Sequence, residues 1–276
     1  MHFNFHFTAI SILWTLTFAS LLVLLVVLMG RDRARRFPWF TASIVLVALR
    51  LLTNRLLHDK LPQLTMGAVA ITLADLSALV GLIVLAEMAR HAFRRGSARA
   101  WAAWGLGLLA IGAVVLWKWG PWPQWKAIAF DTPVAKLQFM QLLAVKTGLL
   151  QDVLSVGLGT LVVAFGRRYG AGWHSHVQRI MIGLSTASLS QMGAQGIWEI
   201  IARHTTPHSR AEYEHVVGLQ EKLLNANSAV YLLVLIWWIV CLWIDEPGAA
   251  ASESESSKIP VPEYLEANET PERLGS

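Results

Sequence analysis

The chain has 276 residues, of which 55% are hydrophobic and only 15% carry a charge. A soluble protein needs more charge than this on its surface, so the composition excludes an ordinary soluble domain and predicts a protein built for the lipid bilayer. The formal net charge is +5, but most arginines stand in short segments between apolar stretches, where they orient helices, so no nucleic-acid partner is expected. The single cysteine, Cys241, allows neither a disulfide framework nor a cysteine-based metal site.

Seven apolar stretches are long enough to cross a membrane as α-helices. A hydrocarbon core of about 30 Å requires roughly 20 apolar residues, whose backbone groups must bond within the segment. Residues 1–8 contain no Lys or Arg and so lack the basic region of a cleaved signal peptide, which predicts a retained first span. The predicted fold class is all-α: a polytopic membrane protein whose residues 1–245 form a seven transmembrane helix bundle. Its spans are expected at residues 8–29, 38–57, 65–88, 101–119, 147–165, 180–201 and 223–244.

The connections between these spans differ in charge. Four arginines follow the first span, four follow the third, and three join the fifth to the sixth, whereas the alternate connections hold six Lys or Arg over longer segments. Basic connections stay in the cytoplasm, so we expect the N-terminus outside and the C-terminus inside, in a plasma membrane and most simply a bacterial inner membrane. The arginines are Arg31, Arg33, Arg35, Arg36, Arg90, Arg94, Arg95, Arg99, Arg167, Arg168 and Arg179.

Two segments outside the predicted spans have distinctive compositions. Residues 117–125 read WKWGPWPQW and stand before a run, residues 135–146, that continues a helical pattern. This pattern indicates either an interfacial cap on the outer side or an ordinary aromatic belt. Residues 246–276 are rich in Glu, Ser and Pro and hold too few apolar residues to pack, which predicts a disordered cytoplasmic tail. No output domain fits in that tail, so a signalling role would need a cytoplasmic or membrane protein partner.

Polar side chains collect in the outer halves of the predicted spans. Such residues are costly in a membrane and usually face the bundle interior or water, so they predict a polar ligand pocket open to the outer side. The inner halves contain almost nothing polar beyond Thr160, and glycines would let the helices approach closely there. The glycines are Gly105, Gly107, Gly112, Gly157 and Gly159. The candidate ligand-binding residues are Arg50, Asp75, Gln151, Asp152, Gln191, Gln195, Trp198, Glu199, Asn225, Asn227 and Tyr231.

Each of these polar groups also has a purely structural interpretation. Arg50 and Asp75 lie roughly 10 Å and 15 Å below the outer surface on consecutive helices, where they could form the charged floor of a ligand site or an ion pair that clamps two helices. The sixth span carries a stripe at i, i+4, i+7 and i+8, which suits a pocket wall, although interhelical hydrogen bonds alone would explain its glutamines. The stripe consists of Gln191, Gln195, Trp198 and Glu199.

No sequence pattern indicates a specific catalytic or metal chemistry. The outer histidines lack an H-E-x-x-H motif, and Pro207 interrupts the local helix, so scattered surface histidines are expected and no metal or cofactor is predicted. His176 is expected to be solvated in a cytoplasmic loop. A retinal protein would need a lysine near the middle of the seventh span, but Lys222 stands at its outer edge. No phosphate loop or nucleophile motif is present either.

These observations favour a receptor-like or sensory module that captures a small ligand from the outer side. The apolar inner half favours this over a conduction path, which would continue as polar or unwound backbone to the other face. Three alternatives stay open: a small secondary transporter using intramembrane Asp, Arg and Glu, an intramembrane enzyme on a lipid-linked substrate, and an accessory subunit of a membrane complex. An enzyme is the less favoured of these interpretations because no catalytic motif accompanies the carboxylates.

Overall fold

A computed structural model of the protein describes residues 9–57, 60–93, 98–120, 122, 132–169, 175–205 and 209–245. Contacts divide the chain into two units, residues 1–244 and 245–276, and the predicted tail, 246–276, lies outside the described residues. All regular elements in the described ranges are α-helices. They are α1 (Ala9–Gly30), α2 (Arg33–Arg36), α3 (Pro38–Leu57), α4 (Gln63–Ala92), α5 (Ala98–Lys118), α6 (Pro133–Tyr169), α7 (His176–His204) and α8 (Arg210–Trp243).

Five helices in the described ranges are long and apolar enough to cross a membrane: α1, α3, α4, α6 and α8. By length and composition the chain is therefore an all-helical membrane protein. The apolar part of α5, Ala103–Lys118, is shorter. The polar side chains of α7 lower its hydropathy below that of a typical span. The prediction of seven spans therefore depends on whether α5 and α7 also cross the membrane.

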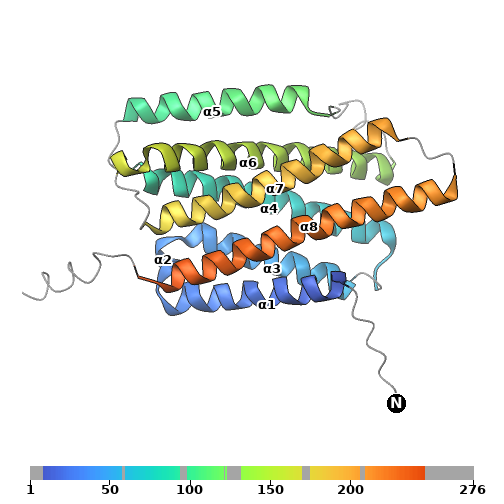
Figure 1. The fold of residues 1–276 in the computed structure, drawn as a ribbon, viewed down its shortest axis with the longest axis horizontal. Coiled ribbons are helices and arrows are strands. Elements are labelled where there is room, and N and C mark those ends of the chain that lie inside the picture. Colours follow the sequence, from blue (N-terminus) through green and yellow to red (C-terminus); the bar gives the residue numbers. More distant parts are fainter. Residues whose placement is uncertain are drawn as a thin grey trace, which may run out of the picture. The chain divides into compact units, whose positions relative to one another are not determined.

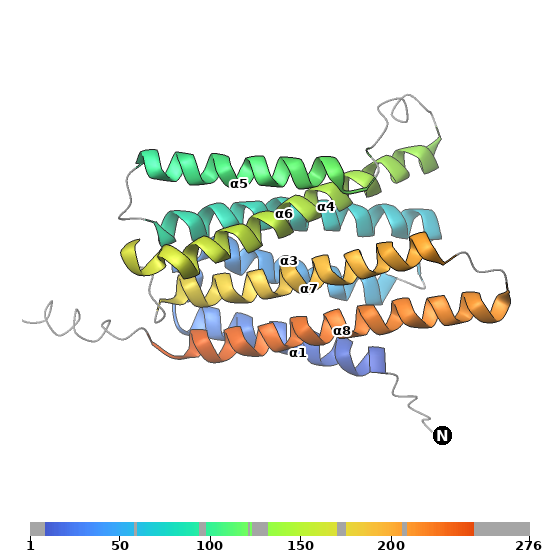
Figure 2. The same ribbon diagram turned by 45° about the horizontal axis from the view of Figure 1, so that its top comes forward.

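Six of the helices pack into a closed ring. α1 packs against α3, α3 against α4, α4 against α6, α6 against α7, α7 against α8, and α8 returns to α1. α4 and α7 also touch across the ring. α5 lies outside it and packs against α6, at the edge of the bundle in both views (Figures 1 and 2). The first and last helices are thus neighbours, and the ring provides an interior shared by six helices.

Two helices are longer than the spans predicted for them. α6 has 37 residues, about 55 Å at 1.5 Å per residue, because residues 134–147 contain no Gly or Pro that would end it. The run 135–146, for which the sequence indicated a helical pattern outside the fifth span, is therefore the first part of α6. α8 begins at Arg210, where the Ser209 side chain accepts a 3.2 Å hydrogen bond from the backbone of Glu212 as an N-cap. Both helices exceed the bilayer core of about 30 Å.

The buried core lies at one end of the ring. We call this the apolar end; there α1, α4, α6 and α8 finish and α3 and α7 begin, and the opposite end is the polar end. Trp238 is central to this core: its ring lies edge-on to Phe40 with centroids 5.1 Å apart, and its Nε1 donates to the Ile180 carbonyl at 3.3 Å. Side chains almost without exposure here include Leu21, Leu24, Leu28, Phe40, Met88, Ile180, Met181, Leu235, Trp238 and Leu242.

Glycine permits the close packing at Trp238. A Cβ on Gly183 would lie 2.2 Å from Trp238 Nε1, and one on Gly157 would lie 2.4 Å from a methyl carbon of Leu108. A close approach at Gly157 was expected from the sequence, whereas the one at Gly183 was not. A Cβ on Gly105 would meet nothing within 4 Å, so that glycine does not serve a helix contact among the described residues.

Charged side chains at the apolar end bind the termini of neighbouring helices. The Glu87 carboxylate of α4 accepts hydrogen bonds from the backbone N–H groups of Trp39 and Phe40, at 3.3 and 3.0 Å, in the first turn of α3. Arg179 of α7 donates to the Cys241 carbonyl at 3.1 Å in the last turn of α8. A carboxylate at a helix start and a cation at a helix end each meet a partial charge of the opposite sign, so both interact favourably with the helix dipole. These charges therefore stabilise the packing of the ring.

The start of α7 is more deeply buried than the sequence indicated. His176 has no exposed surface and Gln178 is 2% exposed, so the expectation of a solvated His176 is wrong. The helix begins at His176, and Ser175 caps it by accepting a hydrogen bond from the Gln178 backbone at 3.3 Å. A residue in the first turn of a packed helix is buried, whereas the sequence analysis placed it in a loop.

Candidate functional site

A cavity of about 860 Å³ lies inside the ring. Residues from all six ring helices line it, and none from α5 do. Its apolar side includes Ile44, Val84 and Leu85, which also belong to the buried core of the apolar end. The polar side chains of its wall are Thr17, Ser43, Arg50, Asn54, Ser77, Gln141, Gln151, Asp152, Ser155, Ser188, Gln191, Gln195, Asn225, Asn227, Ser228 and Tyr231. The cavity wall is therefore mixed: polar side chains from all six ring helices stand among apolar ones, and the core borders it on one side.

The candidate residues from the sequence divide into two groups. Eight of the eleven line this one cavity, from α3, α6, α7 and α8: Arg50, Gln151, Asp152, Gln191, Gln195, Asn225, Asn227 and Tyr231. Asp75, Trp198 and Glu199 do not line it, and each is half-buried elsewhere. Residues that were not among the candidates complete the wall, and they include Asn54, Gln141, Ser155 and Ser188.

Asp75 misses the cavity because of helix geometry. The lining positions of α4 are 70, 71, 74, 77, 78, 81, 84 and 85, one face of a helix. Position 75 is turned about 100° from position 74 and so leaves that face. Arg50 does line the cavity, and it makes no ion pair with Asp75. The proposed clamp between these two residues is therefore absent.

The stripe on α7 is partly engaged in bonds between helices. Ser190 donates to Asn227 Oδ1 at 2.7 Å, and Asn227 Nδ2 donates to the side-chain oxygen of Gln191. This network joins α7 to α8 at the cavity wall, as the structural interpretation of the glutamines anticipated. Gln195, one turn further along, lines the cavity too. Glu199 instead pairs with Arg203 on its own helix.

α6 brings a carboxylate to the same cavity. Asp152 has a hydrogen bond with the side chain of Ser188 on α7. The neighbouring Gln151 amide fits against Gly81 of α4, where a Cβ would lie 2.3 Å from its nitrogen. One turn further, Ser155 is 2% exposed and its Oγ has no hydrogen-bond partner among the described residues, although its carbonyl accepts from Ser185 at 2.9 Å. A buried hydroxyl facing a cavity without a partner indicates room for a polar ligand or water.

Lys146 lies near the middle of α6 and binds the end of α5. Its side chain is buried, at 7% exposure. Its Nζ donates to the carbonyls of Leu116 and Gly120 at 3.0 and 3.3 Å and also to that of Trp119. Gly120 ends α5 with φ +68°, the left-handed conformation typical of helix C-termini. The ammonium thus neutralises carbonyls that have no partner within their helix.

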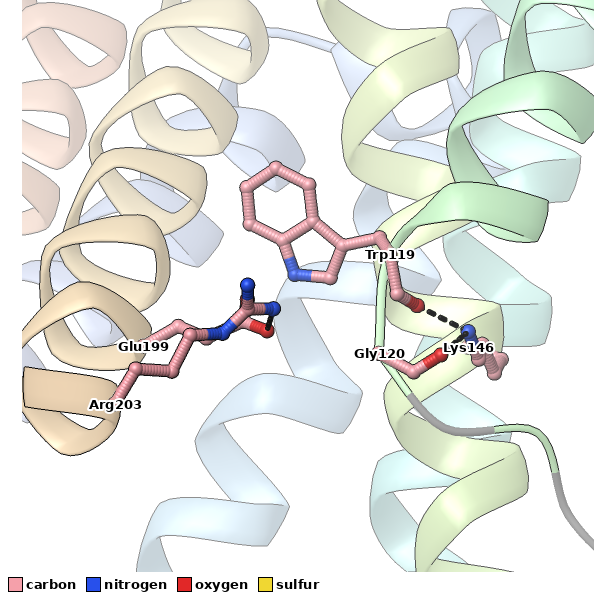
Figure 3. Close-up of polar contacts among 5 residues, drawn as sticks. All are labelled: Trp119, Gly120, Lys146, Glu199 and Arg203. Atoms are coloured by element: carbon pink, nitrogen blue, oxygen red, sulfur yellow. Dashed lines mark hydrogen bonds and ion pairs between the residues drawn. The ribbon is translucent and has the colours of Figure 1, made fainter.

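The same contact continues to α7 through an indole ring. Figure 3 shows Lys146 bonded at Gly120 and Trp119, with the Trp119 ring extending toward the side of Glu199 and Arg203. A Cβ on Gly196 of α7 would lie 3.5 Å from the edge of this ring, so the ring packs on that glycine. Lys146 ends the run 135–146, outside the predicted fifth span, and this role was not predicted from the sequence. A lysine inside an unbroken apolar helix was the available signal.

The described residues provide no evidence of a metal centre. Within the described ranges, no three His, Cys, Asp or Glu side chains gather closely enough to hold a metal ion. His204 and His215 are exposed at the polar end, whereas His208 lies outside the described residues.

Comparisons of the chain with protein-family models, with curated proteins and with solved structures found no match.

Proposed function

We propose that the protein is a receptor-like membrane module that binds a small polar ligand in the cavity of its helix ring. The single observation that supports this most is the convergence of polar side chains from six helices on one cavity of about 860 Å³. This volume is in the range of small-molecule sites, roughly 300–1,000 Å³. Helix packing alone would favour apolar or small residues at these positions.

The apolar end supports binding over conduction. Fully buried Leu, Met and Trp side chains fill the ring on that side of the cavity, and an ion or solute path would require polar groups there. We further propose that all seven long helices cross the membrane, with the N-terminus outside, so that the cavity faces the outer side. Basic residues, among them Arg31, Arg90 and Arg179, lie next to the apolar end. They support this orientation because Lys and Arg beside membrane spans favour the cytoplasmic side.

Ligand binding can be tested on the purified full-length protein in detergent. A thermal-shift screen of small polar metabolites should find compounds that raise the apparent Tm, because a ligand that binds only the folded state stabilises it by mass action. Gln195→Leu, at the cavity wall, should weaken such binding, whereas Gln220→Leu, outside the wall, should not. Equal binding by both variants, or the absence of any stabilising compound, would refute the assignment of the cavity.

Transport is the main alternative function, and an uptake assay on the same purified protein tests it. Liposomes containing the protein should bind the identified compound without accumulating it, with or without an ion gradient. Accumulation above protein-free liposomes would replace the receptor-like proposal with a secondary transporter, in which the apolar end opens during alternating access.

A further inference from the structure

We propose that the ligand of this cavity is a zwitterion with separated charges, as in a dipeptide or tripeptide, whose ammonium group binds Asp152 and whose anionic group binds Arg50. This inference rests on the proposed function and names the ligand class of that site. Within the described part of the chain, Arg50 and Asp152 are the charged side chains of the cavity wall. One is a cation and the other a carboxylate.

The two charges face the same cavity without neutralising each other. No ion pair joins them within 4.0 Å. Arg50 belongs to α3 and Asp152 to α6, and α4 separates these helices in the ring. Neighbouring helix axes are about 8–10 Å apart, so a ligand that touches both groups must carry its own charges several ångströms apart. A single amino acid spans about 3.5 Å along its backbone and a tripeptide about 10 Å.

Charge balance favours a zwitterion over other polar ligands. A charged side chain in a membrane interior is costly unless it is paired. A neutral ligand would leave both Arg50 and Asp152 without a charged partner. A ligand with a charge of one sign would leave one of the two without a charged partner. A zwitterion provides charge-assisted hydrogen bonds to both.

The remaining polar wall fits the body of a short peptide. Amide side chains from four helices line the same cavity as the two charges, and an amide can both donate to a peptide carbonyl and accept from a peptide N–H. Asn54 Oδ1 and Ser155 Oγ have no hydrogen-bond partner among the described residues. The amides are Asn54, Gln141, Gln151, Gln191, Gln195, Asn225 and Asn227.

The test measures the binding of L-trialanine, N-acetyl-trialanine and trialanine amide to the full-length protein in nanodiscs by titration calorimetry. The second probe lacks the ammonium group and the third lacks the carboxylate. Trialanine should bind about 10- to 100-fold more tightly than either analogue, since each loses one charge-assisted contact. Equal affinity for all three probes would overturn the zwitterion.

Two variants test which side chain binds which charged group of the ligand. Asp152→Asn should bind trialanine and its N-acetyl analogue equally, because the partner of the ammonium group is lost, while still discriminating against the amide. Arg50→Gln should show the reverse pattern. Asp75→Asn and Arg55→Gln remove charges outside the cavity wall and should keep the wild-type preferences. A variant that discriminates as the wild type does would exclude its residue from the site.

Separate measurements distinguish the possible failures. The ethanolamine phosphate headgroup of a lipid offers the same pair of charges, so the titration is repeated in nanodiscs with and without phosphatidylethanolamine. Competition by this lipid would assign the cavity to a headgroup and overturn the peptide. Binding of an uncharged metabolite that Gln195→Leu weakens and Asp152→Asn does not would overturn the zwitterion while leaving the ligand-binding function intact.

Discussion

Lys146 provides the sharpest test of how the peripheral helix α5 is held to the ring. α5 packs mainly on α6, and its last carbonyls have no partners within the helix. Lys146→Met keeps the length and much of the apolar stem of the side chain but removes the ammonium group. We expect the variant to loosen the end of α5 and to lower the stability of the bundle.

The magnitude follows from the contacts that are lost. Hydrogen bonds to a charged group contribute about 1.5–3 kcal/mol net, and a charge at a helix C-terminus adds up to about 2 kcal/mol when partly buried. The Lys146 ammonium also lies 4.8 Å from the centre of the Trp122 ring, an interaction of about 0.5–2 kcal/mol. Relief from desolvation of the ammonium offsets part of this sum. We therefore expect a net loss of about 2–4 kcal/mol.

The assay is unfolding by SDS titration in mixed micelles, followed by far-UV circular dichroism, together with hydrogen exchange of the α5 backbone. Lys146→Gln, which retains donors without the charge, should lose about half as much stability as Lys146→Met. Lys136→Met, at an exposed position of the same helix, should change it by less than about 0.5 kcal/mol. If Lys146→Met matched Lys136→Met in both stability and exchange at residues 115–118, the ammonium would not be what holds α5.

Three further predictions concern the apolar end and the topology. Gly183→Val should destabilise the protein by about 2–3 kcal/mol, because the added side chain meets Trp238, whereas Gly193→Val, with open space around it, should cost less than about 1 kcal/mol in SDS titration. Glu87→Gln should cost about 1–2 kcal/mol through weaker capping of α3, and the exposed Asp32→Asn almost nothing, by the same assay. Alkaline phosphatase fused to the C-terminus should be inactive in cells and a fluorescent protein there should be bright; the opposite result would reverse the predicted orientation.

Much of the architecture could be predicted from hydropathy and charge. Length alone indicates helices at each apolar stretch, since hydrocarbon tolerates no open backbone. Depth along each span indicates which end is polar. The sequence therefore predicted eight of the residues that line the cavity, including Asn227 and Tyr231.

Rotation about the helix axis and contacts between helices could not be predicted in this way. Arg50 and Asp75 lie at neighbouring levels in their predicted spans, yet only Arg50 lines the cavity, because the direction in which a side chain faces depends on how α3 and α4 pack. The same limit applies to Lys146 and Glu87, whose partners are backbone atoms of helices distant in sequence. Hydropathy patterns contain no information on which helix terminus lies beside a charge.

Most of the charged side chains that lie between the helices have a structural role, which distinguishes them from the two charges of the cavity wall. Glu87, Arg179 and Lys146 each bind a helix terminus whose dipole has the opposite sign, so each is satisfied by the packing of the bundle itself. Arg50, which is exposed, and Asp152, which is half-buried, differ because they line the cavity and form no ion pair with each other or with another described residue. Since removing either group would relieve an intramembrane charge, neutral replacements should leave the unligated protein as stable as the wild type or more so. Loss of stability in both Arg50→Gln and Asp152→Asn without ligand would instead make these charges part of the packing and would remove the physical reason for a zwitterionic ligand.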